Sequence, residues 1–196
     1  MNYELEIKKL NNFAPSVKFY SGEFLSTINK VVKDFVPFGK VAFITLENTH
    51  LLYSKKVLSA LSGAGSKLIS LVMEKPPKKT VEDFSKAFNL PDDVRAVITF
   101  DRELCPICTY FSSIRDIPFI YVPKSAFVAE SLENVLYVKN GNLLDKVLCK
   151  TTKHVIIDFD LISKTDESAS CYAELMSKNA SIVDYKLYLA LTRKDI

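Results

Sequence analysis

The chain has 196 residues, enough for one domain with or without a further fragment, and 48% of them are hydrophobic, enough to fill a core. The net charge is +3 with basic and acidic residues intermixed, which argues against a nucleic-acid-binding surface. The sequence has no apolar run of about 18 residues and no signal-peptide pattern. We therefore expect a cytoplasmic protein that binds neither nucleic acid nor membrane.

Apolar runs alternate with amphipathic segments up to Pro123, which predicts alternating strands and helices. Such alternation favours an α/β fold with a mostly parallel sheet flanked by helices. The expected helices lie between Ser21-Gly22 and Pro37 and at residues 50–62, 80–88 and 103–113. The expected strands lie at residues 3–7, 16–20, 40–46, 67–73, 96–100 and 117–122.

The second of these helices follows Asn48 and Thr49, which we interpret as a turn and N-cap. Gly63 and Gly65 end it. We expect it to bury five apolar side chains, Leu51, Leu52, Val57, Leu58 and Leu61.

The pattern changes after Pro123. Residues 134–139 and 143–149 flank Asn140-Gly141-Asn142 and are predicted to form a hairpin, followed by a strand at residues 153–157. From about Ser168 to about Arg193 the spacing predicts a long C-terminal helix that is apolar over more than one face. An apolar face without a partner predicts association, either as a homo-oligomer or with a helical partner chain.

The strand, turn, helix and strand of residues 96–123 form the βαβ unit around which the chain is organised. In open parallel sheets ligands bind outside the carboxyl ends of the strands, so the turn from Phe100 to Glu103 is the expected site. We interpret Asp101, Arg102 and Glu103 as a solvated turn. The alternative is a remodelled polar site for another ligand.

Cys105-Pro106-Ile107-Cys108 stands at the start of the helix in this unit. A helix N-terminus lowers a thiol pKa, so a redox pair or half of a zinc site is one interpretation. Buried small residues are the alternative that we favour, because the later hairpin does not suit a thioredoxin-like fold. In the cytoplasm these cysteines, with Cys149 and Cys171, are expected as thiols.

Four stretches together resemble the N-terminal half of the iron-containing alcohol dehydrogenase and dehydroquinate synthase-like superfamily, most closely its glycerol-1-phosphate and glycerol dehydrogenases. Residues 40–49 (KVAFITLENT) resemble the first Rossmann strand, with Asn-Thr at the next helix start. Residues 116–123 (DIPFIYVP) resemble the strand before a Pro-Thr loop, and residues 153–162 (KHVIIDFDLI) the strand after the hairpin. Residues 169–187 (ASCYAELMSKNASIVDYKL) resemble the first catalytic-domain helix.

The resemblance implies a Rossmann-like domain over residues 1–165, and over residues 166–196 the start of a helical metal-binding domain. It also implies NAD(P), with cofactor positions that correspond here to Asn48, Thr49, Phe100, Asp101, Arg102 and Ser125. The family crosses the pyrophosphate with three glycines, and Phe100, Asp101 and Arg102 stand in their place. Because side chains hold a backbone away from phosphates, and because Asp101 and Glu103 repel them, we expect no bound cofactor.

The resemblance implies a zinc or iron site as well. Glu174 stands at the position of the family's metal-binding aspartate, and the family's two histidine ligands would fall beyond residue 196. His50 and His154 lie elsewhere, and a catalytic metal needs about three protein ligands. We therefore expect no complete metal site in this chain alone.

Three functions are compatible with these patterns. The favoured one is a truncated, divergent dehydrogenase-like protein that acts as a binding or interaction module without hydride transfer of its own. The first alternative is an NAD(P)- and metal-dependent glycerol-1-phosphate or polyol dehydrogenase subunit that a partner chain completes. The second alternative is a thiol-redox protein that uses Cys105 and Cys108.

Overall fold

The computed structural model describes residues 17–36, 39–76, 78, 80, 84–85, 89–125 and 134–163. Six parallel strands form one sheet in the order β1-β8-β5-β4-β2-β3, and two antiparallel strands form a separate hairpin, β6-β7. The strands of the sheet are β1 (Val17–Ser21), β2 (Lys40–Leu46), β3 (Lys67–Met73), β4 (Val94–Thr99), β5 (Phe119–Tyr121) and β8 (Lys153–Ile157). The strands of the hairpin are β6 (Val135–Asn140) and β7 (Leu143–Leu148).

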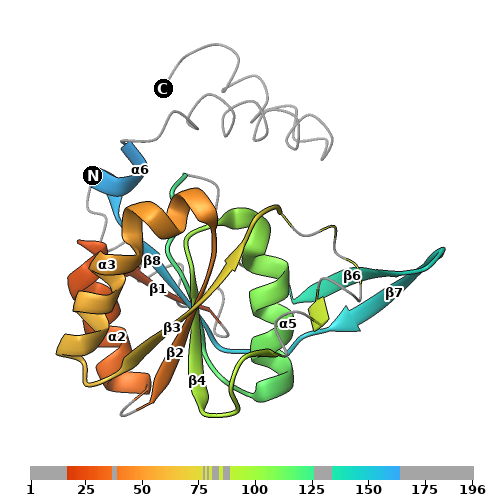
Figure 1. Cartoon of the computed structure of the whole chain (residues 1–196), viewed down its shortest axis with the longest axis horizontal. Helices are drawn as coiled ribbons and strands as arrows, with labels where there is room; N and C mark the ends of the chain where they lie inside the picture. Colours follow the sequence, from red (N-terminus) through yellow and green to blue (C-terminus); the bar gives the residue numbers. More distant parts are fainter. Residues whose placement is uncertain are drawn as a thin grey trace, which may run out of the picture.

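Helices cover both faces of the sheet (Figure 1). On one face lie α2 (Phe24–Phe35), α3 (Glu47–Gly63) and the short α6 (Phe159–Ser163), and on the other lies α5 (Cys105–Arg115), which follows the 3-10 turn η2 (Arg102–Leu104). This confirms the α/β, Rossmann-like fold class expected from the alternating pattern.

Strand β2 shows why helices pack on both faces of the sheet. Its burial is nearly continuous, with Val41 and Phe43 in the core under α2 and α3, and Ala42 and Ile44 in the core under α5. A strand with helices on both faces needs apolar residues at every position, which is the pattern of a central parallel strand.

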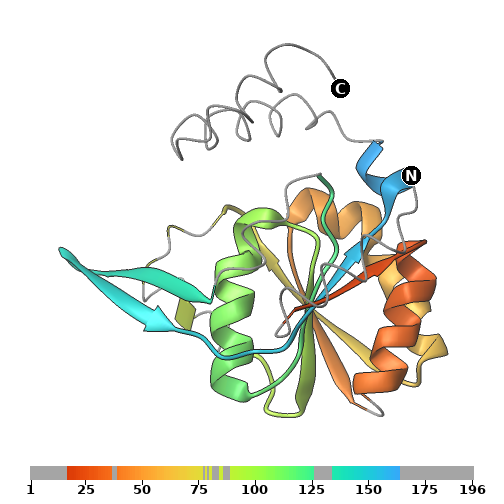
Figure 2. The ribbon, with the colours of Figure 1, turned by 180° about the vertical axis from the view of Figure 1, so that it is seen from behind.

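The hairpin belongs to the α5 side and extends away from the sheet (Figures 1 and 2). Leu136 and Val138 of β6 are buried in the α5-side core, whereas most of β7 is exposed. Gly141 has a φ of +59°, which a glycine adopts without strain in a two-residue hairpin turn.

Two details of the prediction for α3 are wrong. The helix starts at Glu47, so Asn48 and Thr49 lie inside its first turn, and its N-cap Leu46 has no side-chain capping bond. Thr49, Val57 and Leu61 are its buried residues. The helix is rotated relative to the predicted apolar face, which leaves three of the five expected core residues exposed, namely Leu51, Leu52 and Leu58.

Several predictions fall wholly or partly outside the described residues. They are the strand at residues 3–7, most of the helix at residues 80–88, the C-terminal helix with Glu174 and Cys171, and the domain boundary at residue 165. These stay predictions. No helix among the described residues is long and apolar enough to cross a membrane.

Candidate functional site at the carboxyl ends of the strands

The parallel register brings the carboxyl ends of β2, β4 and β5 to one edge of the sheet, which we call the strand-end edge. Residues Thr45 and Leu46 end β2, and Asp101 follows β4 by two positions. Lys124 follows β5 by three positions. The predicted ligand-binding turn therefore lies where the fold places such sites.

Asp101 is fully buried at this edge. One carboxylate oxygen, Oδ2, accepts hydrogen bonds from Thr45 Oγ1 at 2.9 Å and from the backbone N–H of Leu46 at 2.8 Å. The other, Oδ1, accepts from Thr49 Oγ1 at 2.5 Å and from Lys124 Nζ at 2.6 Å. Four donors from three elements thus hold one carboxylate, which contradicts the prediction that Asp101 belongs to a solvated turn.

Lys124 supplies the matching positive charge. Its ammonium lies 2.6 Å from Asp101 Oδ1 and also donates to Thr49 Oγ1 at 2.8 Å, and its side chain is 24% exposed. A buried carboxylate needs both an opposite charge and further hydrogen bonds to remain ionised in the interior. Asp101, Lys124, Thr45 and Thr49, with the Leu46 amide, provide this set, which we call the Asp101 cluster.

The helix N-termini nearest this edge also hold protein carboxylates. The Asp101 cluster takes the amide of Leu46, directly before α3. At the start of α2, Asp158 accepts from Phe24 N at 2.9 Å, and Glu23 accepts from Leu25 N at 3.1 Å and from Ser26 N at 2.7 Å. Free helix amides are what a phosphate binds, and here these amides already have anionic partners.

The start of α5 does not offer free backbone amides for a phosphate either. Cys105, Pro106 and Ile107 are buried there, and Pro106 has no N–H to donate. The pyrophosphate of NAD(P), implied by the family resemblance, does not fit these residues. At the turn it would meet the buried carboxylate of Asp101 in place of open backbone amides.

The remaining predicted cofactor positions are dispersed. Phe100 is buried in the core under α2 and α3, in edge-on or tilted ring contacts with Phe24, Phe43 and Tyr53. Asn48 is exposed. Ser125 is buried and Arg102 is half-buried.

Of the six predicted cofactor positions, Thr49 and Asp101 lie together in the Asp101 cluster. Sequence reasoning missed Thr45 and Lys124. The available signal was their position, since each polar residue stands at the carboxyl end of a strand.

The two cysteines of the CxxC motif form no disulfide and are fully buried. The Cys105 thiol lies 3.9 Å from the carbonyl oxygen of Asp101. Burial raises the pKa of the Cys108 thiol well above its ordinary value, and the nearby Cys105 and Asp101 raise it further. A buried thiol that resists ionisation is a poor nucleophile, which favours the interpretation as buried small residues.

No group of three or more metal-ligating side chains occurs in the part of the chain that the structure describes. His50 is half-buried on α3, and His154 is buried in β8 beside Tyr20 and Phe35. The expected single metal position, Glu174, lies outside the described residues.

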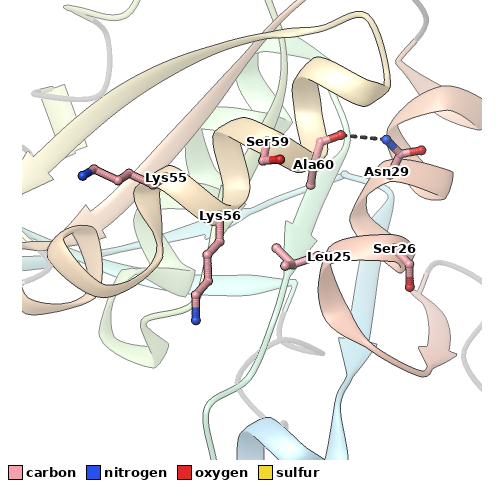
Figure 3. A pocket seen from close by; sticks show the side chains of 7 residues that line it. All are labelled: Leu25, Ser26, Asn29, Lys55, Lys56, Ser59 and Ala60. Carbon is pink, nitrogen blue, oxygen red and sulfur yellow. Dashed lines mark hydrogen bonds between the residues drawn. The ribbon is translucent and has the colours of Figure 1, made fainter.

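A hollow of about 600 Å³ lies between α2 and α3, away from the Asp101 cluster (Figure 3). It is open to solvent and contains none of the predicted site residues. Two of its lining residues link the helices: the side-chain amide of Asn29 on α2 donates to the carbonyl oxygen of Ala60 on α3 at 2.7 Å. Its remaining lining residues are Leu25, Ser26, Lys55, Lys56 and Ser59.

No protein-family model and no curated protein matches the chain. Solved structures do. The chain is similar to NADH-dependent butanol dehydrogenase A from Thermotoga maritima, with a TM-score of 0.67 and 15% identity over 87% of this chain and 49% of that one. For glycerol dehydrogenase from Schizosaccharomyces pombe the values are 0.61 and 17%, over 75% and 38%.

A third similar structure is the 2-epi-5-epi-valiolone synthase of Streptomyces hygroscopicus subsp. jinggangensis, solved with NAD+ and Zn2+ bound. Its TM-score is 0.57 and its identity 14%, over 91% of this chain and 58% of that one. The chain thus spans about half the length of the structures it matches. These likenesses confirm the resemblance at the level of fold: the chain has the fold of the N-terminal portion of the iron-containing alcohol dehydrogenases and dehydroquinate synthase-like enzymes.

Proposed function

We propose that this protein is a divergent, dehydrogenase-like binding module that performs no hydride transfer of its own. The observation that carries the proposal is the Asp101 cluster. A buried carboxylate, held by Lys124 and three further donors, occupies the turn where the fold's dinucleotide-binding members need open backbone.

Charge supports this assignment. A pyrophosphate brought to the turn would compete with Asp101 for the ammonium of Lys124 and would stand next to an uncompensated carboxylate. At about 4 Å, two like charges in a partly buried site repel by several kcal/mol. The hydroxyls of Thr45 and Thr49, which could otherwise donate to a ligand, are committed to the same carboxylate.

The experiment is a thermal-shift and calorimetric titration of the protein with NAD+, NADP+ and inorganic pyrophosphate. A ligand that binds the native state raises the apparent melting temperature. We expect no shift for the wild-type protein with any of the three. A clear shift with either dinucleotide would overturn the proposal and favour a dehydrogenase subunit that a partner chain completes.

The variant Asp101→Gly sharpens the test because it removes the carboxylate and restores a glycine at the turn. We expect it to gain binding of inorganic pyrophosphate through Lys124. Asp116→Gly is the matched control, since Asp116 is exposed and has a φ of +51° that glycine adopts readily. Pyrophosphate binding by the control, or by neither variant, would argue that Asp101 is not what closes the site.

A further inference from the structure

The outer edge of β7 combines unpaired backbone groups with exposed leucines. Among the described residues β7 pairs with β6 alone. Leu143, Leu144 and Leu148 are 70%, 65% and 64% exposed. An exposed strand edge of this kind is a template for pairing with another strand.

The register identifies which backbone groups point outward. Cys149 N donates to Asn134 O at 2.8 Å, so residues 134 and 149 form a hydrogen-bonded pair. Hydrogen-bonded and non-hydrogen-bonded pairs alternate along an antiparallel ladder. The N–H and C=O groups of Leu144, Lys146 and Leu148 therefore point away from β6, and their side chains share one face.

We propose that this edge pairs with β7 of a second copy of the chain, in an antiparallel arrangement about a two-fold axis. Under two-fold symmetry, if residue i of one copy lies opposite residue j of the other, then residue j of the first copy lies opposite residue i of the second. The backbone groups of both residues in a hydrogen-bonded pair must therefore point outward from their own hairpins. The register that uses all three outward residues sets Leu144 opposite Leu148 of the second copy, Leu148 opposite Leu144, and Lys146 opposite Lys146. The two hairpins then form one four-stranded antiparallel sheet.

Charge and apolar contacts select this register. Sliding the strands by two residues in one direction would set Asp145 opposite Asp145 in the closest kind of pair and Leu144 opposite Lys146. Sliding them by two residues in the other direction would set Lys146 opposite Leu148, so either slide loses the pairs of facing leucines. In the proposed register leucines face leucines, and the single like-charged pair consists of lysines whose long exposed stems can diverge. Stacking the exposed faces of two hairpins on each other is disfavoured, because this face carries Lys139 as well as Lys146 and no carboxylate that could pair with them.

The area predicts a weak dimer. A leucine side chain carries on the order of 100 Å² of apolar surface. Together with the backbone edge, the contact buries on the order of 600–800 Å² in total, below the roughly 1,200 Å² of a stable interface. We therefore expect monomers at low micromolar concentration and dimers at hundreds of micromolar. This inference does not depend on the proposed function.

The test is sedimentation velocity of the full chain between about 5 µM and about 1 mM, with the dimer expected at the upper end. Lys146→Pro removes one outward N–H and leaves the bonds to β6 in place, so it should abolish the dimer while far-UV circular dichroism is unchanged. Leu51→Thr is the matched control, because Leu51 is an exposed leucine on α3, and it should dimerise as the wild type does.

A mixing experiment reports on the register itself. Fluorescently labelled wild-type protein is titrated with unlabelled Lys146→Glu. If residue 146 faces its own copy, the mixed pair joins opposite charges and should bind about two- to five-fold more tightly than either protein binds itself. A wild type that stays monomeric to 1 mM, a Lys146→Pro variant that still dimerises, or a mixed dimer no tighter than the parents would each overturn the proposal.

Discussion

The strand-end edge and the outer edge of β7 handle their polar groups in opposite ways. At the strand-end edge, backbone amides and hydroxyls that a phosphate would use already contact the protein's own carboxylates Asp101, Asp158 and Glu23. Along β7, the outward backbone groups pair with no strand in the part of the chain that the structure describes, and leucines lie beside them. At the strand-end edge the protein's own carboxylates occupy the donors that we describe, whereas the hairpin edge is the surface for which we propose a binding partner.

The largest effect should come from removing the carboxylate at the centre of the strand-end edge. Asp101→Ala leaves Lys124, Thr45, Thr49 and the Leu46 amide without their shared acceptor, and breaking a buried ion pair in this way costs about 3–5 kcal/mol. Urea unfolding measures the loss. A cost below about 1 kcal/mol would mean that the edge is solvated and that the contrast with β7 is false.

A double-mutant cycle separates the ion pair from the hydrogen bonds. Lys124→Met alone should also destabilise the protein, because it leaves the buried carboxyl group of Asp101 with only neutral donors. Once Asp101→Ala is present, the same change should cost much less, since the lysine then has no carboxylate to pair with. Additive costs would show that Lys124 and Asp101 act independently.

His154 is a second buried polar group, and it differs from Asp101 because one of its two ring nitrogens lacks a hydrogen-bond partner among the described residues. It tests how such a group affects stability. Its Nδ1 is hydrogen-bonded to the Tyr20 hydroxyl at 2.9 Å, and its buried Nε2 has no partner among the described residues. Burial, with a smaller contribution from Lys18, lowers the pKa of His154 to about 4. The folded state therefore favours the neutral ring.

The direction in which stability changes with pH follows from the lowered pKa. The stability due to the neutral ring is fully present above the unfolded-state value of about 6.5 and is lost as the pH falls toward 4. Between pH 7 and pH 5 the loss should be about 2 kcal/mol. His154→Gln should be less stable at pH 7 but should lack this part of the pH dependence, and equal slopes for the two proteins would contradict the assignment.

A smaller effect is expected at the start of α2. Asp158 accepts from Phe24 N and from Leu161 N, so Asp158→Ala uncaps α2 and α6 together and should cost about 1–2 kcal/mol. Glu23 keeps its bonds to Leu25 N and Ser26 N, which limits the loss. Thermal unfolding measures it, with Asp160→Ala as a control because Asp160 is exposed on α6. Equal losses would show that Asp158 is not a cap.

The layers of the fold were predictable because buried strands and amphipathic helices leave recognisable patterns of apolar residues in the sequence. The runs that became β2, β3 and β8 were predicted to the residue, since each is a short, mostly apolar segment between polar stretches. The phase of α3 was not predictable in the same way. Its leucines include exposed and buried ones, and its buried face consists of Val57, Leu61 and Thr49, whose hydroxyl reaches Asp101.

The sequence could show that polar residues stand at the strand ends, but it could not show that they meet in the Asp101 cluster. Its hydrogen-bonded members are separated by up to 75 positions along the chain, and no local pattern joins Thr45 to Asp101 or Asp101 to Lys124. A turn of aspartate, arginine and glutamate resembles a solvated loop, and for Glu103 the prediction of exposure is right. Only the parallel register of three strands places one of these charges in the interior.

The smallest effect on folding should come from the β7 edge. Leu144→Thr removes an exposed leucine and introduces a residue that suits a strand, so the free energy of unfolding of the monomer should change by less than about 0.5 kcal/mol. Self-association of the same variant should nevertheless weaken, because Leu144 faces Leu148 of the second copy in the proposed register. Urea unfolding at low micromolar concentration and sedimentation at high concentration measure the two quantities separately. A loss of monomer stability above about 1 kcal/mol would mean that Leu144 packs within its own chain, and β7 would then resemble the strand-end edge instead of contrasting with it.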